Sequence, residues 1–258
     1  MAAAILSPHL DDAVLSCWHL LAGPADVTVI NVFAGVPASA GADAWWDRLT
    51  GATDSRQRMH ERVEEDRRAL ALAGRVPVNL DFLDHQYREA EQPLSPIVAQ
   101  IEGLLAPGTH VYAPAALDDH ADHALVRAAA LELGQTGCPV SLYADLPHGT
   151  LHGWPAWVTG AVAPASTDLA GALWGRSLAK TGVAPELMSP LVHELDAAAR
   201  ARKLAAVRAY ATQLQGLAQL AGRPLHDRET LRYEVLWRLP GAARSSLAHA
   251  QRRAVHRR

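Results

Sequence analysis

The chain has 258 residues, of which 49% are hydrophobic, and its formal net charge is -3. A chain of this length and composition can bury a full core as one globular α/β domain, and its near-neutral charge argues against nucleic acid as the main partner. No run approaches the ~18 apolar residues of a membrane-spanning helix, and the first residues lack the features of a secretion signal, so we expect a cytoplasmic protein without a membrane span.

The first elements combine a short apolar strand with a polar run. Residues 1–6 are apolar and are followed within two positions by a proline, which predicts a strand that ends there. A helix is expected over about 11–22, and the turn that enters it can direct His9 and Asp12, three residues apart, to one point. Asp11 points differently and can face the same cavity without binding a metal. The alternative is that both acids only cap the helix and the histidine is a loop residue.

A long segment separates the second expected strand, 27–33, from the next expected helix, 56–73. Loops of this length are uncommon in compact domains unless they are functional or disordered. The segment contains Trp45 and Trp46, and paired indole rings suit stacking on a sugar or covering a pocket. We take Trp46 as a candidate substrate contact; the alternative is that the pair anchors the loop to the core.

A second polar run follows a later strand, expected over 109–113. His120 and His123 stand three apart at the start of a helix expected over 121–134, so they share one face. Asp122 lies between them and can orient an imidazole. The alternative is that the acids cap this helix and the histidines are surface residues. Together the two runs supply two histidines and a carboxylate as metal ligands, and one further acid and one further histidine for catalysis. A hydrolytic zinc site requires this set of residues.

The remaining pattern continues the alternation of strands and helices. Further elements are expected as strands over 78–83, 139–144 and 232–239 and as a helix over 95–105. This alternation predicts a mostly parallel sheet covered on both faces. Residues 149–192 are irregular and are expected to pack over the sheet edge or the pocket, and a long helix is expected over about 193–220. We assign residues 1–240 to a single domain and 241–258 to a basic C-terminal tail.

These motifs resemble those of the LmbE-like (PIG-L) superfamily of zinc-dependent de-N-acetylases. The superfamily has a His-Pro-Asp-Asp-Glu-like run after the first strand and a later His-x-Asp-His run. Supporting matches are an Arg-x-x-Glu helix, starting at Arg62 here, and a late helix, 203–213, that ends in Thr-Gln. The chain departs from the pattern at Leu10 and Ala13, where the superfamily has Pro and Glu, but neither position is a ligand there. The resemblance covers roughly residues 2–240 and implies a Rossmann-like three-layer α/β sandwich.

The resemblance implies a role for each residue of the two runs. The implied metal ligands are His9, Asp12 and His123. Zinc is the expected ion, and the same donors also suit Fe²⁺ or Co²⁺. The implied catalytic residues are Asp11 as general base, a protonated His120 that stabilises the oxyanion, and Asp122, which orients His120. The implied substrate contacts are Arg62, Asp84 and Ser16.

The implied activity is removal of an N-acetyl group from an N-acetylglucosamine-type amino sugar or glycoconjugate, in bacterial specialised or thiol metabolism. The expected partner is a small amino-sugar substrate. A homo-oligomer is a further possibility that the sequence does not decide. One rival is an amidase that cleaves a larger amide, such as a pseudo-disaccharide thiol S-conjugate. Another is a non-catalytic sugar-binding protein, although Asp11 and His120 argue against it because binding alone requires neither. A nucleotide-binding enzyme is disfavoured because no Gly-x-Gly-x-x-Gly run follows the first strand.

Overall fold

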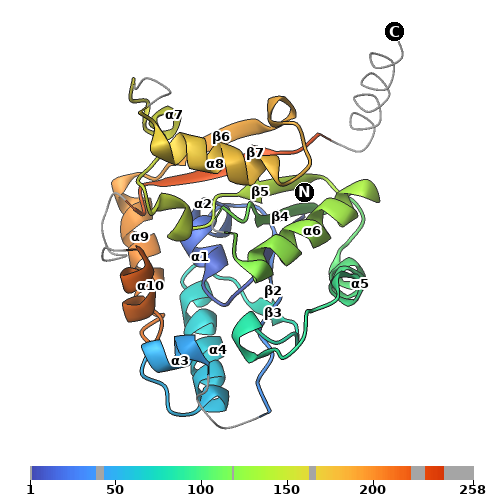
Figure 1. Cartoon of the computed structure of the whole chain (residues 1–258), viewed down its shortest axis with the longest axis vertical. Coiled ribbons are helices and arrows are strands. Elements are labelled where there is room, and N and C mark those ends of the chain that lie inside the picture. The colour runs from blue at the N-terminus through green and yellow to red at the C-terminus, as the bar shows by residue number, and fades with distance from the viewer. Residues whose placement is uncertain (1, 39–43, 118, 163–166, 222–229, 241–258) are drawn as a thin grey trace.

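The computed structural model describes residues 2–38, 44–117, 119–162, 167–221 and 230–240. A seven-stranded sheet runs through them in the order β3-β2-β1-β4-β5-β7-β6 (Figure 1). The strands are β1 (Ala3–Ser7), β2 (Val27–Asn31), β3 (Pro77–Asn79), β4 (His110–Pro114), β5 (Val140–Tyr143), β6 (Ser189–Glu194) and β7 (Tyr233–Arg238). β1 to β5 pair in parallel, whereas β7 runs antiparallel to both of its neighbours.

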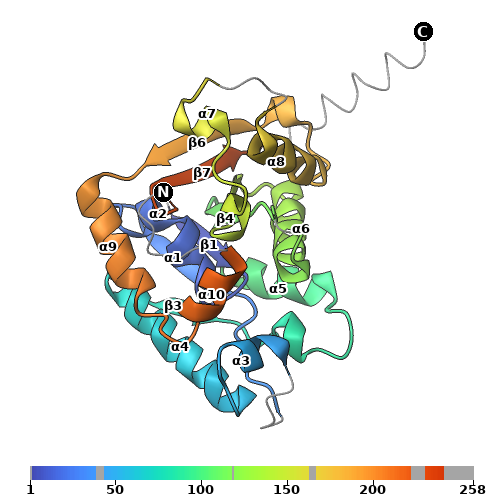
Figure 2. The ribbon, with the colours of Figure 1, turned by 60° about the vertical axis from the view of Figure 1, so that its left-hand side comes forward.

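Helices cover both faces of this sheet. They are α1 (Asp12–Ser16), α2 (Trp18–Leu21), α3 (Trp45–Leu49), α4 (Ser55–Ala71), α5 (Leu94–Leu104), α6 (Ala121–Gln135), α7 (Ala156–Thr159), α8 (Leu169–Ala179), α9 (Ala197–Val207) and α10 (Leu214–Ala221). Adjacent strand residues point to opposite faces, so Ala4 and Leu6 of β1 join a core with α5, α6 and α8. Ala3 and Ile5 join a second core with α1, α2, α4, α9 and α10. Figure 2 shows α4 and α9 on one side of the sheet and α5 and α6 on the other, which confirms the three-layer α/β architecture.

The helix expected over 11–22 is in fact two helices, α1 and α2, with Cys17 between them. The carboxylate of Glu234, from β7, accepts hydrogen bonds from the amides of Trp18 and His19, at 2.9 Å each. A carboxylate that satisfies two amides at a helix start acts as a cap, so α2 begins anew at this point. The sequence around the break does not reveal it, because the capping acid comes from more than 200 positions away.

Two expectations for the later part of the chain are wrong. The stretch 149–192, expected to be irregular, contains α7, α8 and most of β6, the edge strand beside β7. The helix expected over 193–220 is divided into α9 and α10. Tyr210 lies in the turn between them, and its hydroxyl donates to Asp66 of α4 at 2.7 Å, which fixes this turn on α4. The expected basic tail, 241–258, lies outside the described residues.

Across the described ranges, none of the helices combines the length and apolar character needed to cross a membrane.

Candidate active site

The carboxyl ends of β1, β4 and β5 bring the two polar runs together. β1 and β4 are neighbours, and the strand order changes direction between them. Such a switch point is where open α/β sheets form a crevice for ligands. His9 and Asp12 follow β1 directly, and His120 and His123 follow β4, so the sheet topology places the four side chains at one crevice.

Local hydrogen bonds shape the turn that carries His9. The hydroxyl of Ser7 donates to the carbonyl of His9 at 2.6 Å and accepts from the amide of Ala13 at 3.0 Å. The amide of His9 donates to Oδ2 of Asp12 at 2.8 Å. Asp11 occupies the N-cap position of α1, but its side chain makes no capping hydrogen bond. The interpretation of Asp11 as a helix cap is therefore not supported; its side chain lines the pocket instead.

Three donor atoms converge at the base of this pocket. Oδ2 of Asp12 lies 3.5 Å from Nδ1 of His9 and 3.4 Å from Nε2 of His123. Asp12 is 3% exposed and His123 is 1% exposed. These separations are long for hydrogen bonds but match the edge of a tetrahedral zinc site, about 3.3 Å for bonds of about 2.05 Å. His9, Asp12 and His123 are thus placed as a metal site requires.

The other nitrogen of each histidine faces a second carboxylate. Nε2 of His9 lies 3.1 Å from Oδ2 of Asp122, and Nδ1 of His123 lies 3.2 Å from Oδ1 of Asp145. When each ring directs its proton to that outer carboxylate, both inner nitrogens present lone pairs to the oxygen of Asp12. Three lone pairs that meet at one point are stable only around a cation. Histidine ligands in metal sites commonly have such outer carboxylates.

A second group of converging atoms, from His9, His120 and Asp122, is a poorer candidate for a metal. Asp122 already receives Arg88 at Oδ1, at 2.5 Å, and the amide of His85 at Oδ2, at 2.9 Å, besides His9. A carboxylate engaged by three donors has little capacity left to bind a cation. The role of Asp122 in orienting His120 stays a prediction: the Asp122 carboxylate contacts His9, and the Asp122 amide donates to Nδ1 of His120 at 3.2 Å.

The field in the cluster stabilises positive charge. Burial lowers the pKa of His9, but the carboxylates of Asp84, Asp12 and Asp122 outweigh it and raise the pKa to about 10. Burial also raises the pKa of Asp12, yet His123 and His9 hold this pKa well below its usual range. A divalent cation fits the same field and competes with protons, since ligating imidazoles must be neutral. Burial and the adjacent Asp12 raise the pKa of Asp11 to about 6, a suitable value for a general base.

His120 begins α6 and contributes to the same pocket. Its ring meets that of His9 edge to face, with the ring centroids 5.0 Å apart. Because Nδ1 accepts a hydrogen bond from the Asp122 amide, the neutral ring carries its proton on Nε2. The loop before it is held in an unusual conformation, with φ of 54° at Ala116 and 60° at Asp119. The doubly protonated His120 that we expected stays a prediction, and the hydrogen bond at Nδ1 assigns the tautomer of the neutral ring alone.

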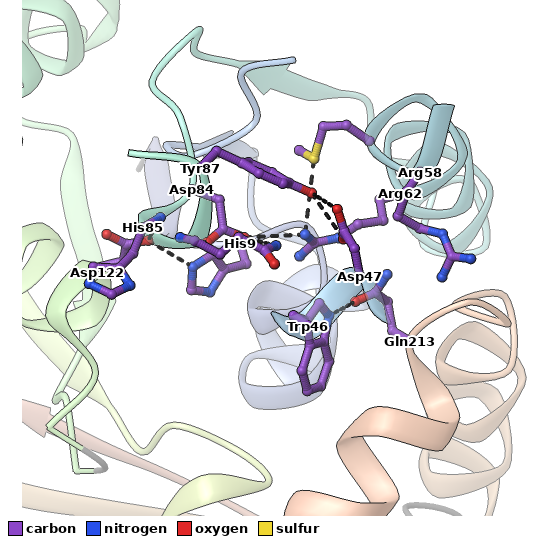
Figure 3. A network of polar contacts seen from close by, with 12 residues as sticks. His9, Trp46, Asp47, Arg58, Arg62, Asp84, His85, Tyr87, Asp122 and Gln213 are labelled. Carbon is purple, nitrogen blue, oxygen red and sulfur yellow. Dashed lines mark hydrogen bonds and ion pairs between the residues drawn. The ribbon is translucent and has the colours of Figure 1, made fainter. Parts of the chain in front are cut away.

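The pocket has one polar and one apolar wall. The polar wall contains Arg62, whose guanidinium lies 3.2 Å from Asp84 (Figure 3). It also contains Gln86, which donates to Asp84. The apolar wall consists of Leu15, Leu146, Leu217 and Trp46. Ser16 does not line the pocket; its buried hydroxyl accepts the amide of Leu146 at 3.1 Å and so supports the wall from behind. Arg62, Asp84 and Trp46 are therefore brought to the pocket, and Ser16 is not.

The two supporting motifs of the sequence contact each other. Glu65, of the Arg-x-x-Glu helix, accepts the amide and the hydroxyl of Thr212 at 2.8 and 2.7 Å. This places the next residue, Gln213, at the pocket, where its Oε1 accepts the indole N–H of Trp46 at 2.8 Å (Figure 3). The Thr-Gln pair thus positions a wall of the pocket.

Sequence reasoning missed three contributors to the site. They are Asp145, Arg88 and Leu146, which lie outside the motifs described above. The available indication for Asp145 was its place directly after a strand that neighbours β4, since acids at that edge share the crevice. Nothing in the local sequence shows that Arg88 contacts Asp122, because that contact depends on the path of the loop after β3.

The fold and the site define a class of α/β protein with a His-Asp-His cluster at the sheet switch point. The family model for PIG-L, described as GlcNAc-PI de-N-acetylase, matches residues 4–133, which is half of the chain. The chain belongs to this family.

Individual relatives agree with the family assignment. The chain is 34% identical over 163 residues to the 2'-N-acetylparomamine deacetylase of Streptomyces fradiae, a match that covers 56% of this chain and only 56% of that relative. Among solved structures, it resembles a deacetylase triple mutant from the teicoplanin biosynthetic pathway, with 26% identity and a TM-score of 0.68. It also resembles a deacetylase of an antimicrobial pseudoaglycone, with 26% identity and a TM-score of 0.66. Each structural match covers 93% of this chain and 98% of the other.

Proposed function

We propose that this chain is a metal-dependent de-N-acetylase of an N-acetylglucosamine-type amino sugar or glycoconjugate in bacterial specialised metabolism. The observation that carries the proposal is the convergence of His9, Asp12 and His123 at the base of a pocket that Asp11 and His120 also line. The family assignment and the deacetylases among the relatives support the choice of reaction.

The donor set suits zinc, and Fe²⁺ or Co²⁺ fit the same nitrogen and oxygen ligands. A metal ion held by His9, Asp12 and His123 would polarise the amide carbonyl and lower the pKa of water. Asp122 and Asp145, which face the outer nitrogens of the two imidazoles, would hold these rings in the orientation that such an ion requires.

Asp11 and His120 have different parts in the proposed reaction. Asp11 does not cap its helix and has a raised pKa, so it takes the proton of the attacking water and passes it to the leaving amine. His120 donates from Nε2 to the oxygen that gains negative charge in the tetrahedral intermediate. Arg62 and Gln86 line the pocket and are the polar side chains that we expect to meet sugar hydroxyls.

The test combines metal content with acetate release from a panel of N-acetylated amino sugars. The Asp11→Asn variant should retain the metal and lose activity, whereas Asp26→Asn, at an exposed site outside the pocket, should behave as wild type. A protein that takes up no metal when supplied with zinc would contradict the proposal. If the protein binds metal but turns over only larger amides, the substrate carries a larger acyl group than acetyl. Metal binding with no turnover of any amide would favour a sugar-binding protein.

A further inference from the structure

Arg88 contacts Asp122, the outer carboxylate of His9, and does not line the pocket. It follows the short helix η1 (His85–Tyr87), and its side chain is 10% exposed. Nη2 of Arg88 lies 2.5 Å from Oδ1 of Asp122, and Nη1 donates to the carbonyl of Leu83 at 2.9 Å. The guanidinium therefore joins the loop after β3 to α6, the helix that carries Asp122.

A buried aromatic ring supports the guanidinium of Arg88. The central carbon of the guanidinium lies 5.0 Å from the centroid of the Phe33 ring, and Phe33 is 1% exposed. The same ring lies 6.3 Å, centroid to centroid, from the imidazole of His9. A planar guanidinium can stack on a ring and donate hydrogen bonds in its own plane, whereas the ammonium of lysine offers only a compact charge. The contacts of Arg88 therefore use the geometry of arginine as well as its charge.

The loop that carries Arg88 also supplies a second donor to the same carboxylate. The amide of His85 donates to Oδ2 of Asp122 at 2.9 Å (Figure 3). The hydroxyl of Tyr87, in the same loop, donates to the fully buried Asp47 of α3 at 2.9 Å, which anchors the loop. Arg88 and His85 thus hold both oxygens of Asp122 from one anchored loop.

This hold on Asp122 reaches the metal-ligand cluster through His9. Oδ2 of Asp122 lies 3.1 Å from Nε2 of His9, and Nδ1 of the same ring lies 3.5 Å from Oδ2 of Asp12. The Asp122 side chain is fully buried, so without Arg88 its Oδ1 would lose a hydrogen bond in a site closed to solvent. The carboxylate would turn to recover a donor, and the imidazole that it orients would turn with it.

The alternative is that Arg88 only balances the charge of Asp122. The two roles have opposite effects on metal binding. A positive charge nearby repels a divalent cation, so Arg88 acting by charge alone would weaken the binding of a metal. Arg88 acting by geometry would strengthen it, because a ligating imidazole that is already oriented binds better.

We propose that Arg88 is a positioning residue for the metal ligand His9: supported by Phe33, it fixes the carboxylate of Asp122, which in turn fixes the imidazole. This inference rests on the metal site of the proposed function and deepens it, because it states what holds that ligand in place. Arg88 does not touch the substrate or the reacting atoms.

The test replaces Arg88 by lysine, which keeps the charge but loses the fork of donors and the stacking plane. We expect the zinc affinity of Arg88→Lys, measured on metal-free protein by competition with a chromophoric chelator, to fall about 10-fold, the lower end for partners of a ligating histidine. Arg75→Lys is the matched control. The guanidinium of Arg75 donates to three backbone carbonyls at 2.8 to 3.0 Å and does not line the pocket, so this variant should keep the wild-type affinity.

A double-mutant cycle separates positioning of His9 from a general loss of stability. In the Asp122→Asn protein the route from Arg88 to His9 is already broken, so adding Arg88→Lys should change the zinc affinity by less than about 2-fold. Phe33→Leu removes the aromatic support of Arg88 and should lower the zinc affinity as well. It decides the question if Arg88→Lys does not fold, and an unchanged affinity in Phe33→Leu would then overturn the inference.

Zinc affinity also separates this inference from the proposed function. If wild type binds zinc but cleaves no amide, the deacetylase function fails, and the role of Arg88 is judged by affinity alone. If wild type binds no zinc, both are overturned. The inference alone is overturned if Arg88→Lys binds zinc as tightly as wild type or more tightly, or if Arg75→Lys loses as much affinity. It is also overturned if Arg88→Lys costs as much affinity in the Asp122→Asn protein as in wild type.

Discussion

Two buried polar clusters of this protein have similar components and different roles. One is His9, Asp12 and His123 at the pocket; the other is Lys203 and Glu234, joined by His19. In the second cluster, Glu234 accepts Lys203 at 2.5 Å, two backbone amides at 2.9 Å each, and Nδ1 of His19 at 2.6 Å. Both oxygens of Glu234 are matched by donors from the chain itself, so this carboxylate is satisfied without a cation.

The pocket cluster is the opposite case. Its outer carboxylates, of Asp122 and Asp145, lie 3.1 and 3.2 Å from the outer nitrogens of His9 and His123, and the inner nitrogen of each ring faces the oxygen of Asp12. Buried acids and histidines therefore indicate a cation site only where carboxylate oxygens and imidazole nitrogens face one another and no donor lies between them. Where every acceptor meets a donor, as at Glu234, the same residue types serve the stability of the fold.

Removing Asp12 should produce the largest effect and break the first cluster. Asp12→Asn takes away the only carboxylate among the three converging donors, so we expect loss of metal and of all metal-dependent activity. Metal content by mass spectrometry of purified, zinc-supplied protein checks this. Glu194→Gln is the control, because Glu194 forms an exposed ion pair with Arg232 far along the chain from the site. Full zinc occupancy in Asp12→Asn would remove Asp12 from the ligand set.

Removing Lys203 should break the second cluster and leave the first intact. Lys203→Met leaves Glu234, 1% exposed, without its counter-charge, so the free energy of unfolding should fall by about 3–5 kcal/mol. Urea unfolding measures this, and metal content per folded chain should stay at the wild-type value. The double variant Lys203→Met/Glu234→Gln should recover part of the loss, since it removes the unpaired charge. A single variant as stable as wild type would show that the ion pair contributes nothing net.

The outer carboxylates allow a finer test of the comparison. Asp145→Asn keeps the shape of the side chain but loses the charge that orients His123, so metal affinity should fall about 10- to 100-fold. Competition with a chromophoric chelator gives the affinity. The same change at Asp122 should act similarly through His9. If activity is lost while the metal affinity stays unchanged, Asp122 and Asp145 take part in the reaction itself and do not act through the metal ligands.

The acid dependence of stability should show the smallest effect. Burial raises the pKa of Glu234, but Lys203 and His19 outweigh it and hold the pKa at about 2, below its ordinary value of 4.5. A depressed folded-state pKa stabilises the protein above the unfolded value and loses that contribution as pH falls through the folded value. The stability difference between wild type and the Lys203→Met/Glu234→Gln variant should therefore shrink as pH falls from 4.5 to 2. A constant difference over this window would contradict the account of Glu234.

The sequence predicts the parallel part of the fold well, because each strand there is a short apolar run followed by a polar turn. The same local pattern identifies His9, Asp12, His120 and His123, which follow their strands within a few residues. It fails where the deciding contact is distant in sequence. Glu234 divides α1 from α2, and Asp66 holds the turn at Tyr210, and neither partner is visible locally.

In the site, too, the sequence predicts local features and misses contacts between distant residues. The spacing of the two runs predicts that their histidines and acids share one crevice, and the family resemblance implies which three converge. Neither predicts that Asp122 contacts His9 or that Asp145 contacts His123. The different exposure of Trp45 and Trp46 also escapes the sequence, since it depends on Gly216 and Gln213 of a later segment.

X-ray absorption spectroscopy at the zinc edge tests the central claim most directly, with wild type and His120→Ala compared after loading with zinc. The account predicts two imidazole ligands at about 2.0–2.1 Å with oxygen ligands at about 2.0–2.2 Å, and the same spectrum for both proteins. Three imidazoles in wild type that become two in His120→Ala would contradict it, because His120 would then be a ligand and not the donor to the oxyanion.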